Sequence, residues 1–257
     1  MLLEVSRLGK RFGGLVAVND LSFSVAAGEI LSIIGPNGAG KSTCFKLISA
    51  FMTPSAGAVH FNGIDITAIG PHHVARAGVV RTFQENTSFQ DMTVREAVVL
   101  GHQKDCRASL AGMILRTPAA RRDNAEAADN ADRILDLLGM TGVGDTLAAS
   151  LPHGLLRTLG IAVALAAKPK LLLLDEPFAG LNVEETRRGV GLIRKIRDQG
   201  VTPILVEHDM SAVMSVSERI LVLNFGVKIA EGSPAEIQAN DQVIEAYLGT
   251  KDEEIGV

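Results

Sequence analysis

The glycine-rich segment GPNGAGKST, at residues 35–43, constrains the fold more than any other part of the sequence. It matches the phosphate-loop pattern GxxxxGK[ST], which belongs after a buried strand and before a helix. The apolar run 30–34 fits the strand, and residues 41–51, followed by Pro54, fit the helix. Glycines let the backbone wrap around an anion so that successive N–H groups and the helix N-terminus face it. We therefore expect a strand–loop–helix unit that binds nucleotide phosphates.

The side chains of this loop have separate expected tasks. Lys41 is expected on the β- and γ-phosphates, and Ser42 is expected to offer its hydroxyl to Mg²⁺. The residues expected to contact the nucleotide are Gly35, Pro36, Asn37, Gly38, Ala39, Gly40, Lys41, Ser42 and Thr43. The alternative, a glycine-rich turn with a surface lysine, does not explain the strand before the loop and the helix after it.

A second motif places two carboxylates at the end of an apolar strand. Four leucines at residues 171–174 run directly into Asp175 and Glu176. Ligands of open α/β sheets bind at the carboxyl ends of the strands, and adjacent strand residues point to opposite faces, so the two acids can act separately. Asp175 is expected to hold Mg²⁺, and Glu176 to orient or deprotonate the attacking water. The alternative is a pair of surface acids.

The rest of the chain predicts an α/β fold with a helical insert. Leu21, Phe23 and Val25 alternate with serines, as in a half-buried strand. Residues 93–144 are rich in alanine and lack strand alternation. Helical and strand patterns then alternate, which favours a parallel sheet with crossover helices; they fall at residues 155–167, 171–174, 184–199 and 203–206. We expect one domain over 1–257, with a catalytic core at 1–92 and 150–257 and a helical subdomain at 93–149.

Composition excludes several classes of protein. Hydrophobic residues make up 47% and charged residues 21%, which is typical of a folded chain. A net charge of −4 argues against nucleic acid as the main partner. The apolar run 159–167 is shorter than the roughly 20 residues that span a bilayer, and charged residues near the start argue against a secretory signal, so a cytoplasmic location is expected. Cys44 and Cys106 lack metal-site spacing and are interpreted as structural thiols.

The motifs and their order resemble the nucleotide-binding subunit of an ABC transporter over essentially the whole chain. This resemblance implies a P-loop NTPase core with N-terminal antiparallel strands, and ATP with Mg²⁺ as ligands. It assigns Phe12 of KRFGG to stacking on adenine, Gln84 of RTFQ to the metal and the membrane-subunit interface, and His208 of VEHDM to the γ-phosphate. Residues 179–182, AGLN, take the place of the loop that crosses the dimer. The alternatives are a core phenylalanine at Phe12 and a satisfied buried histidine at His208.

The signature segment departs from the family pattern. By the resemblance, this segment usually reads LSGGQ and contacts the ATP of the partner subunit; here it is Leu151, Pro152, His153, Gly154 and Leu155. Pro152 removes a serine hydroxyl and a backbone N–H, although the start of a helix still offers its dipole. We therefore expect a heterodimer with one stronger and one weaker ATP site. The alternative is a subgroup that tolerates the variant segment.

Three features resemble the ATPases of branched-chain amino-acid importers: the VEHDM segment, the long helical stretch at 101–139 and the ending VIEAYLG. That resemblance implies two membrane-spanning permease subunits, a second related ATPase or a self-copy, and indirectly an extracytoplasmic solute-binding protein. The chain would act peripherally on the cytoplasmic face of the cell membrane. Residues 85–92, with Phe89 and Met92 as apolar candidates, are expected to contact a permease helix, the alternative being ordinary packing beneath a loop.

Other functions stay open from the sequence. Importers of urea and short-chain amides share the three features, and homodimeric lipopolysaccharide-export ATPases have the same order of motifs. A regulatory ATP-binding module with weak hydrolysis is a different class, favoured only by the altered signature. Chromosome-maintenance ATPases are disfavoured, since the sequence has no sustained heptads.

Overall fold

In the computed structural model, which describes residues 1–82, 89–102 and 117–248, the strand before the phosphate loop lies inside a six-stranded sheet. The strand order is β10-β9-β3-β8-β7-β6. Strand β3 pairs in parallel with β8 and β9, β7 pairs in parallel with β8 and β6, and β10 pairs antiparallel with β9. The strands are β3 (Leu31–Ile34), β6 (Val79–Arg81), β7 (Leu171–Asp175), β8 (Thr202–Val206), β9 (Arg219–Asn224) and β10 (Val227–Gly232). The predicted parallel sheet is confirmed.

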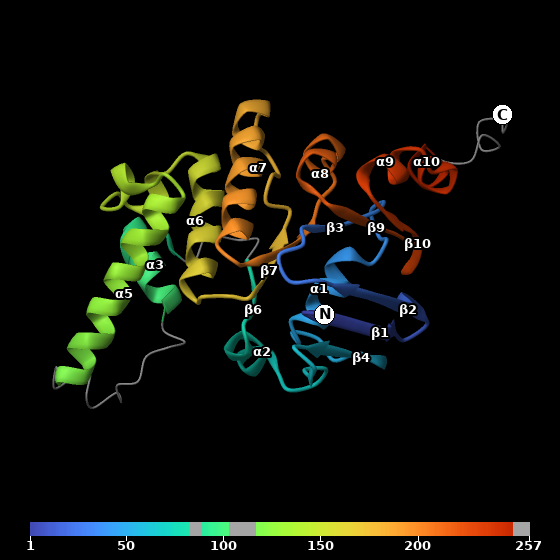
Figure 1. Cartoon of the computed structure of the whole chain (residues 1–257), viewed down its shortest axis with the longest axis horizontal. Coiled ribbons are helices and arrows are strands. Elements are labelled where there is room, and N and C mark those ends of the chain that lie inside the picture. The colour runs from blue at the N-terminus through green and yellow to red at the C-terminus, as the bar shows by residue number, and fades with distance from the viewer. Residues whose placement is uncertain (83–88, 103–116, 249–257) are drawn as a thin grey trace.

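A second, antiparallel sheet lies beneath the first, with helix α1 (Lys41–Ile48) between them (Figure 1). Its strand order is β2-β1-β4-β5, and the strands are β1 (Leu3–Phe12), β2 (Leu15–Val25), β4 (Ala56–Phe61) and β5 (Ile64–Asp65). The expected alternation is present, since Leu21, Phe23 and Val25 are buried. Helix α1 ends three residues earlier than predicted because the chain turns there, with Ala50 in the left-handed region.

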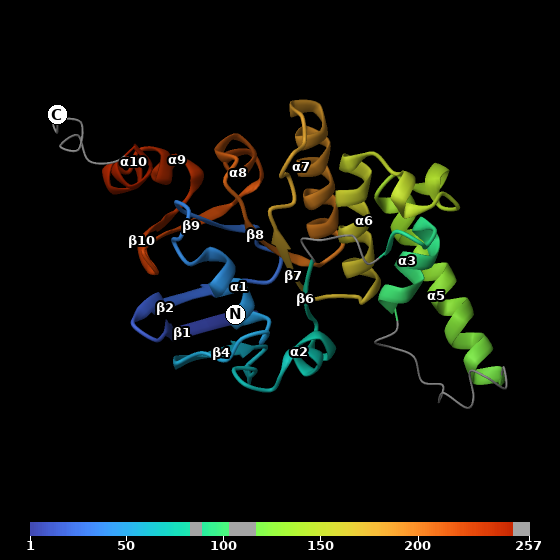
Figure 2. The same cartoon turned by 180° about the vertical axis from the view of Figure 1, so that it is seen from behind.

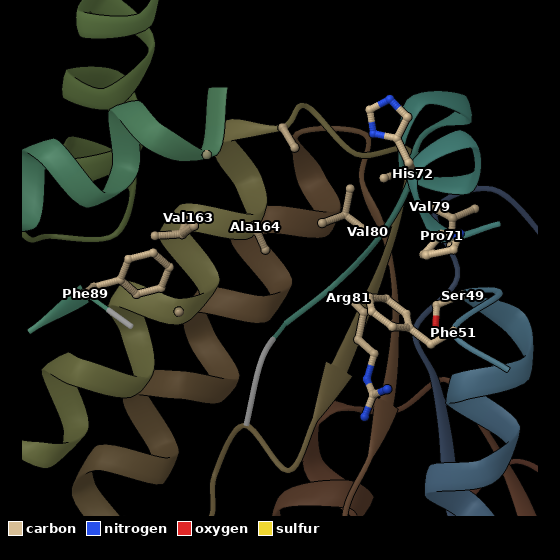
Figure 3. A pocket seen from close by; sticks show the side chains of 14 residues that line it. Ser49, Phe51, Pro71, His72, Val79, Val80, Arg81, Phe89, Val163 and Ala164 are labelled. Atoms are coloured by element: carbon tan, nitrogen blue, oxygen red, sulfur yellow. The ribbon is translucent and has the colours of Figure 1, made fainter. Parts of the chain in front are cut away.

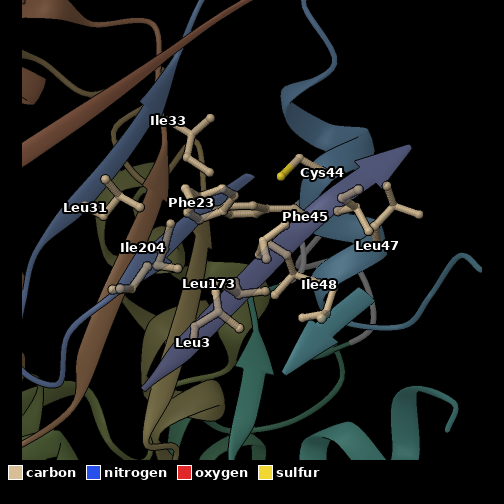
Figure 4. Close-up of a cluster of buried hydrophobic side chains, with 14 of the residues drawn as sticks. Leu3, Phe23, Leu31, Ile33, Cys44, Phe45, Leu47, Ile48, Leu173 and Ile204 are labelled. Atoms are coloured by element: carbon tan, nitrogen blue, oxygen red, sulfur yellow. The ribbon is translucent and has the colours of Figure 1, made fainter. Parts of the chain in front are cut away.

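The main core fills the space between the two sheets (Figure 4). Leu3 and Phe23 come from the antiparallel sheet, Ile33 and Leu173 from the parallel sheet, and Phe45 from α1. Because α1 starts at the phosphate loop and its apolar face packs into this cluster, the helical end of the loop is anchored to the main core.

Helices α3 (Val94–Gly101), α5 (Pro118–Leu137) and α6 (His153–Ala166) form a layer at one end of the parallel sheet (Figure 2). Two 3₁₀ turns, Thr141–Val143 and Ala148–Ser150, complete the described part of the predicted insert, which is helical. Helix α6 begins after the expected end of that insert, yet it packs against α3 and α5. Gly101 permits the close α3–α6 approach, since a Cβ there would collide with the carbonyl oxygen of Val163.

The remaining helices are α2 (Pro71–Ala77), α7 (Val183–Asp198), α8 (Met210–Val216), α9 (Pro234–Gln238) and α10 (Asp241–Leu248). Helices α6, α7 and α8 stand in a row on the face of the parallel sheet opposite α1 (Figure 1). Over the described ranges, every helix is too short or too polar to cross a bilayer. Gln84 and Cys106 lie outside the described residues.

Candidate functional site

The phosphate loop follows β3 and is clamped between two other strands. Gly35 and Gly40 have φ values of 150° and 97°, which favour glycine. A Cβ at Gly35 would collide with the carbonyl oxygen of Leu223 in β9, and one at Gly40 with that of Ala17 in β2. Both glycines are therefore required by the close approach of neighbouring backbone as well as by conformation.

Lys41 is the first residue of α1 and is buried. Its ammonium group donates hydrogen bonds to the loop carbonyls of Gly35, at 2.7 Å, and Pro36, at 3.0 Å. Burial lowers the pKa of Lys41, while the negative charges of Glu176 and Asp175 oppose that change. The lysine of the loop thus lies within electrostatic reach of the two strand-end acids, and Ser42 is exposed beside it.

Asp175 ends β7 and is only 3% exposed. Its Oδ2 accepts a hydrogen bond from Nη2 of Arg81 at 2.5 Å. Its Oδ1 is buried and has no hydrogen-bond partner among the residues that the structure describes. A buried carboxylate oxygen without a partner is unfavourable, and carboxylate and hydroxyl oxygens are the ligands that Mg²⁺ prefers, directly or through water. Asp175 and Ser42 therefore fit a magnesium ion.

Arg81 was missed by the sequence analysis. It ends β6, which lies beside β7 in the sheet, with Arg81 opposite Leu173. The available signal was a basic residue three positions before Gln84, at the end of a short apolar run. Its pairing with Asp175 depends on which strand neighbours β7, and the sequence order does not state that.

Glu176 occupies a bend and not a continued strand. Strand β7 ends at Asp175, and Glu176 has a φ of 49°, in the left-handed region. The expectation that the two acids alternate across a strand is therefore wrong. Oε1 of Glu176 lies 3.9 Å from Nδ1 of His208. The His208 side chain is 60% exposed, so the alternative of a satisfied buried histidine is also wrong.

Glu207 is a second residue that the sequence analysis missed. It follows β8, is completely buried, and accepts hydrogen bonds from the backbone N–H groups of Phe178, at 2.7 Å, and His208, at 3.1 Å. Burial raises the pKa of Glu207, and these hydrogen bonds oppose the rise. The signal was an acidic residue between an apolar strand and a candidate histidine.

Phe12 lies at the end of β1 and is 45% exposed, which excludes the alternative of a core phenylalanine. The ammonium group of Lys10 lies 5.3 Å from the centre of its ring. The strand that follows carries Ala17, whose carbonyl oxygen approaches the phosphate loop at Gly40, so the hairpin that carries Phe12 contacts the loop through its second strand.

The signature segment forms the start of α6. Pro152 is the N-cap residue, and the first intrahelical hydrogen bond runs from the N–H of Leu156 to the Pro152 carbonyl at 3.0 Å. Nε2 of His153 lies 3.2 Å from the carbonyl oxygen of Ala179, and Gly154 approaches the carboxylate of Glu185. The segment therefore lies beside residues 179–182 of the same chain.

A separate cavity of about 390 Å³ lies between the helical layer and α2 (Figure 3). Phe89 and Val163 line one side, and Phe51 and Pro71 line the other, with Arg81 at one edge. Phe89 is 8% exposed and belongs to the core cluster of the helical layer, so its ring is packed and also borders the cavity.

Comparisons with known proteins agree with this geometry. The family described as "ABC transporter" matches residues 18–179, and the family described as "Branched-chain amino acid ATP-binding cassette transporter" matches residues 227–253. The chain is 41% identical to the high-affinity branched-chain amino acid transport ATP-binding protein BraF of Pseudomonas aeruginosa and 42% identical to LivG of Salmonella typhimurium. Each alignment covers 96% of this chain and 98% of the relative.

A solved structure supports the same fold. The crystal structure of the ADP conformation of an ATP-binding cassette of an ABC transporter superposes with a TM-score of 0.86 at 29% identity. The superposition covers 97% of this chain and 99% of the chain in the solved structure.

Proposed function

The chain belongs to the ABC transporter family of ATP-binding proteins, and from that premise we propose that it is the ATP-hydrolysing subunit of a branched-chain amino-acid importer. Its similarity to BraF and LivG over nearly its full length, together with the C-terminal match at 227–253, supports this substrate class over urea and short-chain amides and over lipopolysaccharide export. The single observation that carries the catalytic part of the proposal is that buried Lys41 of the phosphate loop lies within electrostatic reach of Asp175 and Glu176.

Different residues of the chain have different roles in ATP hydrolysis. Lys41 and the N–H groups of residues 35–43 hold the β- and γ-phosphates. Ser42, Asp175 and Gln84 would hold Mg²⁺, which neutralises developing phosphate charge when bound. Glu176 orients the attacking water and accepts its proton. Its side chain is partly exposed, so water can reach the carboxylate.

Two further side chains complete the nucleotide site. His208 lies close to the carboxylate of Glu176 and donates to the γ-phosphate. Phe12 offers an exposed ring to adenine, and the nearby Lys10 adds positive charge for the nucleotide.

We infer that two cassettes face each other, each presenting its signature segment to the ATP of its partner. The N–H groups of His153, Gly154 and Leu155, at the start of α6, lack intrahelical acceptors and carry the positive end of the helix dipole. The signature segment, Leu151, Pro152, His153, Gly154 and Leu155, therefore retains an anion-binding character without the usual serine. A related ATPase with an intact signature would serve this chain's phosphate loop, so the proposed assembly is a heterodimer with unequal sites, and a self-copy is the alternative.

The cavity between α2 and the helical layer is proposed as the permease contact. It borders Phe89, and Arg81 joins it to Asp175 at the metal site. Two membrane-spanning permeases would bind there and keep the chain at the cytoplasmic face of the membrane, with a solute-binding protein on the other side. Nucleic acid is not part of this proposal, in line with the net charge of −4.

The test uses the complex purified from detergent-solubilised membranes and reconstituted into proteoliposomes. Mass spectrometry should find two permeases and a second ATPase, and the proteoliposomes should take up leucine when ATP is supplied. Glu176→Gln should bind ATP but lose hydrolysis by at least about 100-fold, as expected for removal of a general base. A wild-type rate in that variant would refute the role of Glu176, and a wild-type complex without hydrolysis would favour a regulatory module.

Phe89→Ala separates the permease contact from the ATP site. It should leave the ATPase rate of the free subunit intact and reduce leucine uptake by the complex. Unchanged uptake would contradict the placement of the permease at this cavity.

A further inference from the structure

A series of contacts connects the signature segment to His208 within one chain. Nε2 of His153 lies 3.2 Å from the carbonyl oxygen of Ala179. The neighbouring Phe178 donates its backbone N–H to Oε1 of Glu207 at 2.7 Å, and Oε2 of Glu207 accepts the N–H of His208 at 3.1 Å. The surface that serves the partner's nucleotide is thereby joined to the histidine that serves this chain's own nucleotide.

Glu207 is the central residue of this connection. Its side chain is completely buried, and burying a carboxylate is costly unless hydrogen bonds compensate. Both of its oxygens are used by backbone N–H groups that flank catalytic positions, since Phe178 lies two residues after Glu176, and His208 follows Glu207. The N–H of Glu176 itself donates to the carbonyl oxygen of Val206 at 2.9 Å, so the end of β8 holds both ends of the bend that carries the catalytic base.

The family pattern usually has glycine at position 153. His153 therefore adds a side-chain contact that glycine cannot make. The imidazole of His153 fits because the facing residue 180 is a glycine, with a φ of 77°. A Cβ at Gly180 would lie only 3.0 Å from Nε2 of His153. The departure from the family pattern at residue 153 is therefore matched by open space in the facing loop.

We propose that Glu207 is a positioning residue, and that the contacts from His153 through Ala179, Phe178 and Glu207 to His208 make the geometry of this chain's catalytic groups depend on its signature segment. This rests on the proposed function of the nucleotide site. Glu207 touches neither nucleotide nor water in the mechanism above; it acts by fixing the backbone beside Glu176 and His208.

Glu207→Gln tests the central residue, because the amide keeps the shape of the side chain but has one oxygen in place of the two that accept the N–H groups of Phe178 and His208. In the reconstituted complex, kcat should fall about tenfold, as expected for one lost hydrogen bond to a charged group, while KM for ATP stays within about twofold. The backbone amides of Phe178 and His208 should exchange hydrogen faster. The control is Glu236→Gln, which alters another carboxylate that accepts a backbone N–H, that of Ser233 at 2.7 Å, in a helix cap away from the site.

His153→Ala tests the exposed end of the connection. Alone, this variant should lower kcat by a few fold and speed backbone hydrogen exchange in residues 178–182. Combined with Glu207→Gln, it should cause little further loss of kcat, because both changes break the same connection. Additive losses in kcat, a higher kcat in His153→Ala, or unchanged exchange would overturn the proposal. Since His153 is exposed, this variant remains informative if Glu207→Gln does not fold.

Hydrogen exchange also separates this inference from the proposed function. If the wild-type complex does not hydrolyse ATP, the proposed function fails. Faster exchange at Phe178 in His153→Ala would still support the connection, and unchanged exchange there would overturn it.

Discussion

Nη2 of Arg81 lies 2.5 Å from Oδ2 of Asp175, so the carboxylate assigned to Mg²⁺ has a cationic partner on its other oxygen. The Asp175 side chain is fully buried and that of Arg81 is 14% exposed. One oxygen is therefore fixed by the guanidinium, while the other, Oδ1, has no hydrogen-bond partner among the described residues and is free for the proposed magnesium ion. The same arginine borders the cavity between α2 and the helical layer, so one side chain connects that cavity to Asp175.

Arg81→Ala should lower the free energy of unfolding by about 3 kcal/mol, because it leaves the charge of Asp175 buried without its partner. Urea denaturation of the purified chain measures this change. The matched control is Arg187→Ala, which breaks an ion pair with Glu184 on the exposed surface of α7 and should lower the free energy of unfolding far less than Arg81→Ala does. Equal effects in the two variants would contradict a buried role for the Arg81 pair.

Gly35→Ala should abolish ATP binding or reduce it strongly. The φ of 150° at Gly35 disfavours any side chain, and the added methyl group would collide with the backbone of β9 at Leu223. Isothermal titration with ATP gives the affinity. Gly200→Ala is the control, since Gly200 also has a positive φ of 85° but open space around its Cβ position. That control should lose about 1 kcal/mol of stability and keep ATP affinity. Equal ATP affinity in both variants would show that the collision does not occur.

Cys44 should be unreactive in the folded protein. Its thiol is fully buried in α1, and burial raises the pKa of Cys44 to about 12, so almost no thiolate is present at neutral pH. In a Cys106→Ser variant, which leaves one thiol, a chromogenic disulfide reagent should react only after urea unfolds the chain. Fast labelling in buffer would contradict the burial of α1 between the two sheets.

The nucleotide-binding motifs could be predicted because each is continuous in sequence. The loop at 35–43 carries its own strand before it and helix after it, and the acids at 175 and 176 follow their strand directly. The parallel sheet also followed from local alternation. These features depend on residues close together in the chain.

The residues that the sequence did not reveal depend on contacts between distant segments. Arg81 reaches Asp175 because β6 lies beside β7, and Glu207 reaches Phe178 because the end of β8 lies beside the bend after β7. The bend itself, with Glu176 in the left-handed region, was missed because glutamate rarely adopts that conformation and no glycine marks the turn. Strand order and local strain are set by tertiary packing.

The stability of the folded chain should depend on pH through Glu207. Burial raises the pKa of this carboxyl above its usual 4.5, against the opposing hydrogen bonds from Phe178, His208 and Asp209 and the charge of His208. The folded state then binds a proton more readily than the unfolded state, so the free energy of unfolding falls as pH rises from 4.5 through the raised pKa. Urea unfolding across this range should show a wild-type slope that Glu207→Gln lacks. The comparison is repeated in a His208→Gln background, which removes the charge of the imidazole. If glutamate and glutamine at residue 207 give equal pH slopes in that background, the raised pKa of Glu207 is contradicted.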